Sequence, residues 1–562
     1  MKIKEVLLNM LSLEGIRHIF MVPGGLIDPF LTAFDSGIDI TPIVAAQEGG
    51  AAYMADGYAR ASNKFGVCLC IGGPGVTNTM TPILAAKSDE SPLLILSGEV
   101  PTFAEGLGMF QDASLISLDD FDILKSSTKS SVIIAHANLF HHHFQHSLQT
   151  MLTPIRSPVH ICIPKDIQET DIGNIELKPL GPAYYSSKVL DASAAETCLE
   201  DFKNTKVVIL AGNGVDTPEG ALALRRLSEA LEIPVATTLR AKGVLPEDHP
   251  LSLGVFGYAG TAHATQALMH ENLEVLIVLG SGLNQRDSMD WTKQLSPSIR
   301  FIQVNLNLEA SSSQYAHNLN VQGDCQTFLE YVSSKNLKPV PARKEWVEKI
   351  KSAPRLYDSE NQFSMAAPIH PARVVHDLRQ VAPKDTVLLV DSGAHRAFCG
   401  HYWEAYHAGE YISATNLGPM GWAIPAGIGV KLAVPQKPCC VVTGDGCMLM
   451  HGMEIQTAAR YKIPLVYVVI NNSALGNVYL RAEKEGKTAM ELTSLPDHDW
   501  AGFARALGAQ SETVKDPNTL KDAFKRAFSS NATYLLDIKC GKGFSTPVEP
   551  FTEAAKTWSY QD

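Results

Sequence analysis

The stretch CCVVTGDGCMLMHGMEIQTAARYKIPLVYVVINNSALGNV, residues 439–478, decides how the C-terminal part of the chain folds. A short apolar run ends at Gly-Asp-Gly, residues 444–446. After a helix-length segment, a second apolar run ends at Asn471 and Asn472. Short runs rich in Val and Ile that alternate with helix-length segments are typical of parallel strands buried on both faces. The stretch therefore predicts a strand–helix–strand unit of an open α/β sheet.

The same alternation runs through the whole chain and predicts several sheets. Polar segments that contain prolines interrupt it at 168–190 and 336–371. We therefore expect three α/β domains with doubly wound parallel sheets, at residues 1–170, 190–335 and 365–545. Ligands of such sheets bind beyond the carboxyl ends of the strands.

The composition narrows the classes of function. The 562 residues carry a net charge of −12 and contain no dense basic run, so we expect neither nucleic acid nor an anionic membrane as a partner. No apolar stretch approaches the ~20 residues that span a bilayer, and the N-terminus lacks the pattern of a signal peptide. The ten cysteines form no C-x-x-C pair, which favours free thiols in a reducing cytoplasm.

Asp445 and Asn472 are candidate ligands of a metal ion. Mg²⁺ prefers hard oxygen ligands and commonly takes one or two protein groups together with phosphate oxygens. Asp445 offers a carboxylate at the end of one predicted strand, and Asn472, 27 residues later, offers an amide oxygen at the end of the next. Neighbouring parallel strands lie ~4.8 Å apart, so both side chains can reach one ion. A Gly-Asp-Gly turn without a ligand is the alternative, and the asparagine at the second strand end argues against it.

Glu48 belongs to a second, distant set of motifs. It opens the segment EGGAAYMADGYAR, residues 48–60, which predicts an amphipathic helix. The glycine-rich loop GGPGVTN at 72–78 lies between a predicted strand and a helix. Taken alone, Glu48 would most often be a solvated or helix-capping acid.

The segment 439–478 closely resembles the diphosphate-binding motif of thiamin diphosphate enzymes. The motifs around Glu48, the segment IPVATTLRAKGVLPEDHPLSLGVFGYAGT at 233–261 and the segment GPMGWAIPAGIGVKLA at 418–433 extend the likeness. Nearly the whole chain resembles the large-subunit acetolactate synthase family, also called acetohydroxyacid synthase. The resemblance implies a pyrimidine-binding, a central and a diphosphate-binding domain, with thiamin diphosphate and Mg²⁺ as cofactors.

The resemblance also implies the roles of single residues. Glu48 matches the glutamate that hydrogen-bonds the pyrimidine ring and promotes ionisation of the thiazolium carbon. Met420 matches the residue that forces the bent shape of the cofactor. Asp445, Asn472 and the backbone carbonyl of Ala474 match the Mg²⁺ ligands. The other positions that match cofactor contacts are Pro23, Gly24, Pro74, Asn78, Gly393, Ala394, His395, Gly418, Gly444, Gly446, Cys447, Leu475, Gly476 and Asn477.

The activity that the resemblance implies is carboligation. A 2-keto acid such as pyruvate is decarboxylated, and its acyl anion is ligated to a keto acid or aldehyde acceptor. Phe110 and Gln111 match the Phe-Gln pair of acetolactate synthases, and Lys165 matches a lysine near their substrate channel. Simple 2-keto acid decarboxylases carry a His-His pair near that position, whereas residues 141–143, a run of three histidines, lie too far downstream and are expected on a solvated helix face. A non-oxidative decarboxylase or a carbon–carbon lyase on the same cofactor is the alternative.

Some positions depart from the family pattern. Arg481 replaces the tryptophan that packs against the second 2-keto acid in biosynthetic members, which predicts a more acidic or larger acceptor, or a side chain facing solvent. Arg286 matches an arginine that contacts FAD, but Asn284 and Gln285 replace an Asp-Asp pair, so FAD is a cofactor that the sequence allows and does not favour. Family enzymes pair the pyrimidine side of one subunit with the diphosphate side of another, so we expect a homodimer or homotetramer.

Two hypotheses from other classes are open. A nucleotide-binding oxidoreductase would use the Gly-Asn-Gly loop at 212–214, but no complete G-x-G-x-x-G follows a strand. A catalytically silent cofactor-binding subunit would be expected to lack Glu48, Asp445 or Asn472, and all three are present.

Overall fold

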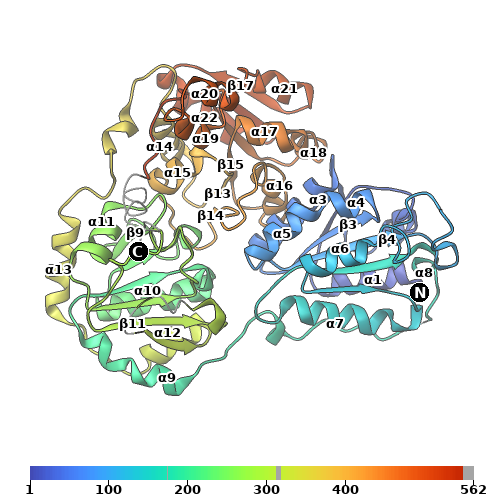
Figure 1. Cartoon of the computed structure of the whole chain (residues 1–562), viewed down its shortest axis with the longest axis horizontal. Helices are drawn as coiled ribbons and strands as arrows, with labels where there is room; N and C mark the ends of the chain where they lie inside the picture. The colour runs from blue at the N-terminus through green and yellow to red at the C-terminus, as the bar shows by residue number, and fades with distance from the viewer. Residues whose placement is uncertain (174, 312–314, 316–317, 549–562) are drawn as a thin grey trace.

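The computed structural model describes residues 1–173, 175–311, 315 and 318–548. It contains three six-stranded sheets in which every strand pair is parallel, with helices packed on the sheets (Figure 1). This confirms the predicted α/β class. The sheets span residues 18–164, 207–322 and 387–539, inside the predicted domain limits, and those limits themselves stay predictions.

The first and third sheets share one topology. Their strand orders are β2-β1-β3-β4-β6-β5 and β14-β13-β15-β16-β18-β17, so the order reverses between β1 and β3 and between β13 and β15. Open α/β sheets bind ligands at such reversals. The N-terminal strands are β1 (His18–Met21), β2 (Thr41–Val44), β3 (Gly66–Ile71), β4 (Leu93–Glu99), β5 (Ser130–Ile133) and β6 (Val159–Pro164). The C-terminal strands are β13 (Val387–Val390), β14 (Tyr411–Ile412), β15 (Cys439–Gly444), β16 (Val466–Asn471), β17 (Gln510–Val514) and β18 (Tyr534–Lys539).

The central sheet has the order β12-β11-β10-β7-β8-β9. Its reversal lies between β7 and β10, and the loops after these two strands touch. A Cβ added to Gly212 would lie 2.5 Å from the carbonyl oxygen of Gly280, so backbone packing accounts for a glycine there. The central strands are β7 (Val207–Ala211), β8 (Val235–Thr237), β9 (Ser252–Val255), β10 (Val275–Leu279), β11 (Arg300–Asn305) and β12 (Asn318–Gln322).

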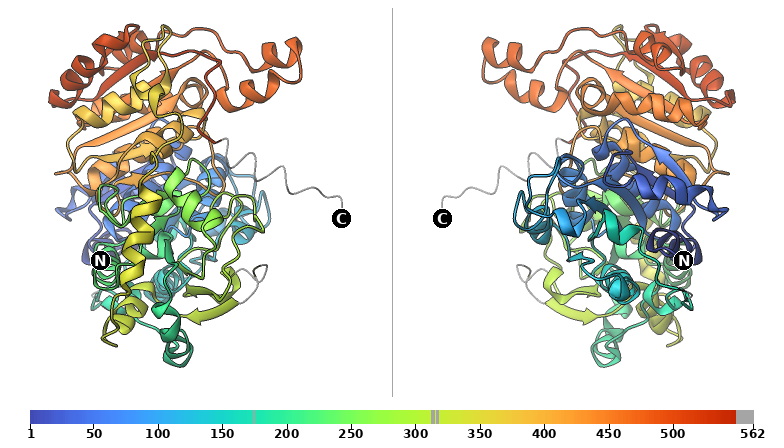
Figure 2. Two further views of the ribbon diagram at one scale, coloured as in Figure 1. Left: turned by 90° about the vertical axis from the view of Figure 1, so that its left-hand side faces the viewer. Right: turned by 90° about the vertical axis from the view of Figure 1, so that its right-hand side faces the viewer.

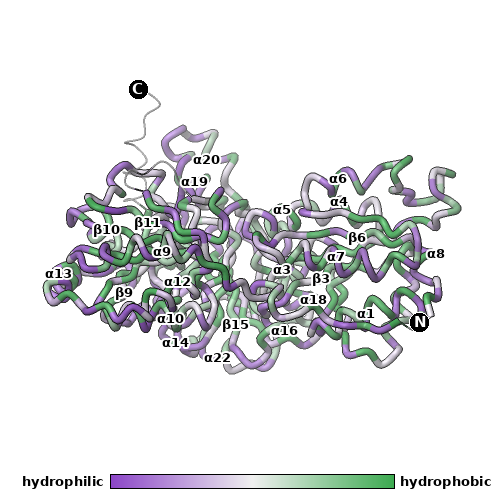
Figure 3. Tube along the Cα trace, turned by 90° about the horizontal axis from the view of Figure 1, so that it is seen from below, coloured by the Kyte–Doolittle hydropathy of each residue, from purple (hydrophilic) through white to green (hydrophobic). Residues whose placement is uncertain are grey.

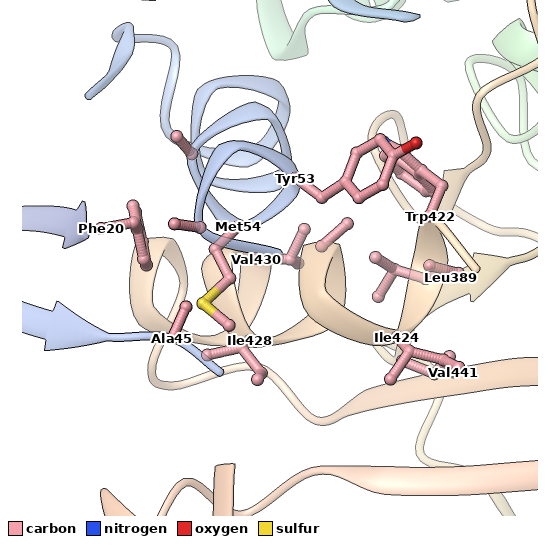
Figure 4. Close-up of a cluster of buried hydrophobic side chains, with 14 of the residues drawn as sticks. Phe20, Ala45, Tyr53, Met54, Leu389, Trp422, Ile424, Ile428, Val430 and Val441 are labelled. Atoms are coloured by element: carbon pink, nitrogen blue, oxygen red, sulfur yellow. The ribbon is translucent and has the colours of Figure 1, made fainter. Parts of the chain in front are cut away.

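Two helices join the N-terminal and C-terminal sheets. α3 (Glu48–Ser62) packs on α16 (Ala423–Ala433), and their side chains share one buried apolar cluster. Figure 4 shows this contact, with Tyr53 and Met54 on α3 above the side chains of α16. At one end of the contact the indole Nε1 of Trp422 donates a 2.8 Å hydrogen bond to Asp56.

The backbones of α3 and α16 approach each other at two glycines. A Cβ added to Gly429 would lie 1.8 Å from the carbonyl oxygen of Met54, and one added to Gly57 would lie 2.2 Å from that of Ala426. Only residues without a side chain fit at these two positions. The pair therefore sets how the N-terminal and C-terminal sheets are placed relative to each other.

Apolar residues lie mainly in the strands and on the helix faces that cover them (Figure 3). Within the described residues, no helix combines the length and the apolar character needed to cross a membrane. Two short helices of the C-terminal part, α19 (Gly476–Ala482) and α20 (Lys487–Thr493), project from the body of the molecule (Figure 2).

Candidate functional site

Three neighbouring strands of the C-terminal sheet end at one edge and carry most of the predicted cofactor residues. β15 leads directly into α17 (Asp445–His451), and Asn472 directly follows β16. The two strands pair in parallel, with Gly444 opposite Ile470. Asp445 and Asn472 therefore lie at adjacent strand ends, as their spacing in the sequence predicts.

Asp445 is a buried acid with one oxygen left unpaired. Its side chain is only 2% exposed, and its Oδ2 accepts a 3.2 Å hydrogen bond from the backbone N–H of Ala474. Its Oδ1 has no hydrogen-bond partner. Burial raises the pKa of Asp445 to about 7, because the carboxylate is largely removed from water. A buried, uncompensated carboxylate oxygen fits a cation ligand.

The donor set predicted around Asp445 would suit Mg²⁺. Among the residues that the structure describes, no group of three or more His, Cys, Asp and Glu side chains could hold a metal ion. A cage made entirely of charged protein ligands is therefore absent from that part of the chain. A carboxylate, an amide oxygen and a backbone carbonyl leave positions open for phosphate oxygens, which is how Mg²⁺ is commonly bound.

Three loops meet at Gly446, in the first turn of α17. A Cβ added there would lie 2.5 Å from Met420 and 2.7 Å from Leu475. Met420 belongs to the connection between β14 and α16, and Leu475 to the loop after β16. The same connection carries Gly418, which adopts φ +66° and lies beside Ser392 at the end of β13.

The end of β13 lies against the same edge. Gly393 caps α15 (Ala394–Tyr402), and the His395 ring lies about 3.1 Å from the position of a Cβ on Gly444. Burial lowers the pKa of His395 to about 3, so the ring is neutral at physiological pH, and its Nε2 has no partner. The Cys447 thiol donates to the carbonyl oxygen of Ser392 at 3.2 Å.

The loop after β16 is the last of the chain segments that carry predicted diphosphate-side residues. A Cβ added to Gly476 would lie 3.0 Å from the Ala394 side chain and 3.2 Å from the Asn472 amide, so Gly476 fits between β13 and β16. Asn477 is the next residue of α19. The structure thus brings the predicted diphosphate-side positions together from four chain segments.

The predicted pyrimidine-side residues gather at the carboxyl edge of the N-terminal sheet. Asn78, which ends α4 (Pro74–Asn78) after β3, donates a 2.9 Å hydrogen bond to Oε2 of Glu48, which opens α3 after β2. Pro23 and Gly24 follow β1, which lies between β2 and β3.

Lys165 lies beside the loop that follows β1. Its Nζ donates to the carbonyl oxygen of Gly25 at 2.6 Å and lies 3.8 Å from Oδ2 of Asp28. The lysine therefore contacts the residue that directly follows Gly24, a predicted cofactor contact.

Phe110 and Gln111 lie on the long connection between β4 and α6 (Asp120–Ser127). The Phe110 side chain is 82% exposed, and Gln111 adopts φ +61°. Two residues later, Ala113 packs at 3.5 Å against the position of a Cβ on Gly72, in the glycine-rich loop before α4. The connection therefore continues along the pyrimidine-side edge.

The two half-sites are not joined by a direct hydrogen bond or ion pair in the part of the chain that the structure describes. Among the described residues, no hydrogen bond or ion pair links Glu48 or Asn78 to Asp445 or Asn472. Glu48 opens α3, whereas Trp422, two residues after Met420, is hydrogen-bonded to Asp56. Asp56 lies eight residues after Glu48 on the same helix, which is ~12 Å along the helix axis.

Sequence reasoning missed two buried acids. Asp391 directly follows β13 and accepts hydrogen bonds from Ser392 N, Gly421 N and Thr443 Oγ1, at 2.9, 2.9 and 3.0 Å. It thereby ties the Met420 segment to the ends of β13 and β15. Its position after an apolar run was the available signal. The second acid, Glu454, contacts residues distant in sequence, and no local pattern marks it.

The remaining predicted features lie away from these two edges or on the surface. The three histidines at 141–143 belong to α7 (Phe140–Leu152), and His142 is exposed. Arg481 is exposed on α19. Arg286 lies over the ring of Tyr258 at 4.5 Å in the central part. None of these contacts indicates a binding site for FAD.

Three family models of thiamine pyrophosphate enzymes match the chain. The N-terminal TPP binding domain matches residues 1–119, the central domain matches 202–332, and the C-terminal TPP binding domain matches 391–538. Thiamine pyrophosphate is a second name for thiamin diphosphate. The three matched segments follow each other in the order predicted from the sequence.

The chain is similar over most of its length to acetolactate synthases. It is 32% identical to a probable acetolactate synthase large subunit of Methanocaldococcus jannaschii, over 98% of this chain and 94% of that protein. It is 28% identical to the large subunit of acetolactate synthase isozyme 1 of Escherichia coli, over 84% of this chain and 82% of that protein. It is 27% identical to the mitochondrial acetolactate synthase catalytic subunit of Saccharomyces cerevisiae, over 97% of this chain and 81% of that protein.

Proposed function

Since the chain belongs to the thiamine pyrophosphate enzymes, in the family of the acetolactate synthase large subunits, we propose that it is a thiamin diphosphate-dependent carboligase. It decarboxylates a 2-keto acid such as pyruvate and ligates the acyl group to a keto acid or aldehyde acceptor. The single observation that carries this proposal is the buried, unpaired Oδ1 of Asp445 at the strand edge of a chain that is similar throughout to acetolactate synthases.

Residues of both sheet edges have roles in the proposal. Thiamin diphosphate supplies, when bound, a thiazolium carbon that acts as nucleophile and electron sink. Glu48 holds a proton at the pyrimidine side, and Asn78 keeps the carboxylate in place through their 2.9 Å hydrogen bond. Asp445, Asn472 and the carbonyl of Ala474 would hold Mg²⁺, which neutralises the diphosphate.

We assign substrate binding to residues that lie along the carboxyl edge of the N-terminal sheet. Lys165 offers a cation for the 2-keto acid carboxylate, next to the loop after β1. Phe110 and Gln111 offer an apolar ring and an amide, and neither side chain can protonate the bound acyl unit as an acid would. This supports ligation to a second carbonyl compound over simple release of an aldehyde.

Product analysis tests the proposal directly. The purified protein is incubated with thiamin diphosphate, Mg²⁺ and a panel of 2-keto acids, singly and in pairs, and products are identified by NMR. Glu48→Gln is the control, because it keeps the shape and removes the acid. Acetolactate or another hydroxyketone that disappears in Glu48→Gln supports the carboligase. Free aldehyde alone would favour the decarboxylase, and no CO₂ release with any 2-keto acid would contradict the proposal.

We also propose that two copies of the chain form each site. No hydrogen bond or ion pair among the described residues joins Glu48 to Asp445 or Asn472, and the two half-sites lie on different sheets. Apolar side chains are exposed next to both halves, and exposed apolar patches mark interaction surfaces. They include Phe103, Leu107, Phe110 and Ile116 beside the N-terminal edge, and Leu449, Met450 and Met453 on or next to α17. A homodimer, or a homotetramer built from it, would cover them.

Subunit complementation tests this arrangement. Glu48→Gln and Asp445→Asn chains are each expected to be inactive alone. If each site takes Glu48 from one chain and Asp445 from the other, a random mixture of co-expressed chains regains about a quarter of wild-type activity, because half the dimers hold one intact site. If both residues acted within one chain, the mixture would stay inactive.

The proposal keeps the cytoplasm as the location, since all ten cysteines are free and buried, as in proteins of a reducing compartment. It includes no requirement for FAD. Dialysis against FAD-free buffer should leave turnover unchanged, and loss of turnover that FAD restores would contradict this part.

A further inference from the structure

Glu454 is a buried acid that reaches from the C-terminal part of the chain to the start of α3. It ends the short helical turn that follows α17 and is only 1% exposed. Its Oε2 accepts the backbone N–H of Ala46 at 3.1 Å, and its Oε1 accepts that of Gln47 at 3.3 Å. One carboxylate thus binds the two peptide groups directly before Glu48.

The first turn of α3 is shaped around this carboxylate. A Cβ added to Gly50 would lie 1.9 Å from Oε1 of Glu454, so only glycine leaves room for the acid. Gly50 N in turn donates to the side chain of Gln47 at 3.3 Å, which caps the helix. On the other side, the hydroxyl of Thr457 donates to Oε2 of Glu454 at 2.7 Å. The acid is therefore held in place from its own helix as well.

We propose that Glu454 is a positioning residue for Glu48: by accepting the N–H groups of Ala46 and Gln47, it sets the point from which α3 begins and so the place of the Glu48 carboxylate. This inference rests on the proposed function, in which Glu48 acts at the pyrimidine side. Hydrogen bonds to an ionised acceptor are about twice as strong as neutral ones, so the carboxylate is well suited to hold the backbone where it enters α3.

The position of Glu454 predicts a specific defect when it is removed. Asp445 lies nine residues earlier, at the opposite end of the helical segment, so the proposed metal ligands stay in place. A shift of ~1 Å at a catalytic group can cost about 100-fold in rate. We therefore expect Glu454→Ala to lower turnover ~10- to 100-fold, with the apparent Kd for thiamin diphosphate changed less than about twofold.

Three variants separate this role from a general loss of structure. Glu454→Gln keeps one acceptor oxygen and is expected to lose less turnover than Glu454→Ala. Gly50→Ala pushes the carboxylate away from the other side and is expected to reproduce the defect. In the Glu454→Ala background, Gly50→Ala should add little, because residues that act through one contact are not additive. Deuterium exchange at the thiazolium C2 of bound cofactor, followed by NMR, should slow in the same ratio as turnover.

A readout on the ligand-free protein tests the contact itself. Hydrogen–deuterium exchange of the peptide 43–50 should accelerate at Ala46 and Gln47 in Glu454→Ala. Glu410 is the matched control, because its buried Oε2 accepts the N–H groups of Tyr406 and His407, both at 2.9 Å, in a loop before β14. Glu410→Gln should accelerate exchange only in its own loop and leave turnover unchanged.

The possible results decide the inference separately from the proposed function. Unchanged amide exchange at Ala46 and Gln47, or full turnover in a folded Glu454→Ala, would overturn the role of Glu454. Equal losses of turnover in Glu454→Gln and Glu410→Gln would also overturn it, because they would indicate a non-specific effect. If the wild-type protein itself turned over no 2-keto acid, the proposed function would fail, while amide exchange would still decide the contact.

Discussion

The contact between α3 and α16 makes one substitution informative about both fold and function. In Gly429→Ala, the new Cβ would lie 1.8 Å from the carbonyl oxygen of Met54, so the helices must separate by about 1.2 Å to restore even a 3.0 Å contact. Overpacking of this kind costs ~1–3 kcal/mol, and alanine returns about 1 kcal/mol of helix propensity. Because the clash is with backbone and no side chain can rotate away, we expect the upper end of that cost, a net loss of roughly 2 kcal/mol and a thermal midpoint lower by about 4 °C.

The same shift should impair catalysis, because α3 begins at Glu48 and α16 follows the segment that carries Met420. A displacement of ~1 Å predicts a loss of turnover of about 10- to 100-fold. Circular dichroism melts and steady-state kinetics on the purified variants measure both effects. Gly57→Ala, which meets the same contact from the other helix, should behave alike, whereas Gly181→Ala, with open space around it, should not. A Gly429→Ala protein with wild-type melting and turnover would refute the described helix contact.

Three further substitutions have distinct expected outcomes. Asp445→Asn removes an unpaired buried charge, so the metal-free variant should melt at or above the wild-type temperature. Calorimetry should show that Mg²⁺ with thiamin diphosphate no longer raises the melting temperature of this variant. A melting temperature that still rises with both ligands would contradict the metal assignment. Trp422→Phe removes the donor to Asp56 and should cost ~1–3 kcal/mol in urea unfolding, and a smaller loss would mean that another donor replaces it. Burial lowers the pKa of His160 to about 3, so below pH ~6.5 the unfolded chain binds a proton that the folded protein does not, and stability falls as pH falls. Wild type should lose about 1.2 kcal/mol relative to His160→Gln between pH 6 and pH 5 in urea titrations, and parallel pH curves would exclude this linkage.

Local patterns in the sequence were sufficient for the class of fold and for most of the diphosphate-side edge. The apolar run that begins at Cys439 and ends at Gly-Asp-Gly coincides with β15, because runs of buried β-branched residues are a short-range signal. Asp445 and Asn472 could be placed together from the same signal, since parallel neighbouring strands present their ends at one edge. The predictions of the cofactor and of the class of reaction came from the family resemblance. The family models and the relatives that are similar over most of the chain support both predictions.

What only the tertiary structure decided are the contacts between residues far apart in the chain. Glu454 accepts the N–H of Ala46 across 408 positions, and Trp422 donates to Asp56 across 366. Nothing in the neighbourhood of either residue marks such a contact, because it depends on how the first and third sheets pack through α3 and α16. The sequence by itself therefore determined which groups stand at each sheet edge. The packing of the sheets decided how the two edges are placed relative to each other, since the glycine-lined helix contact holds α3 against α16.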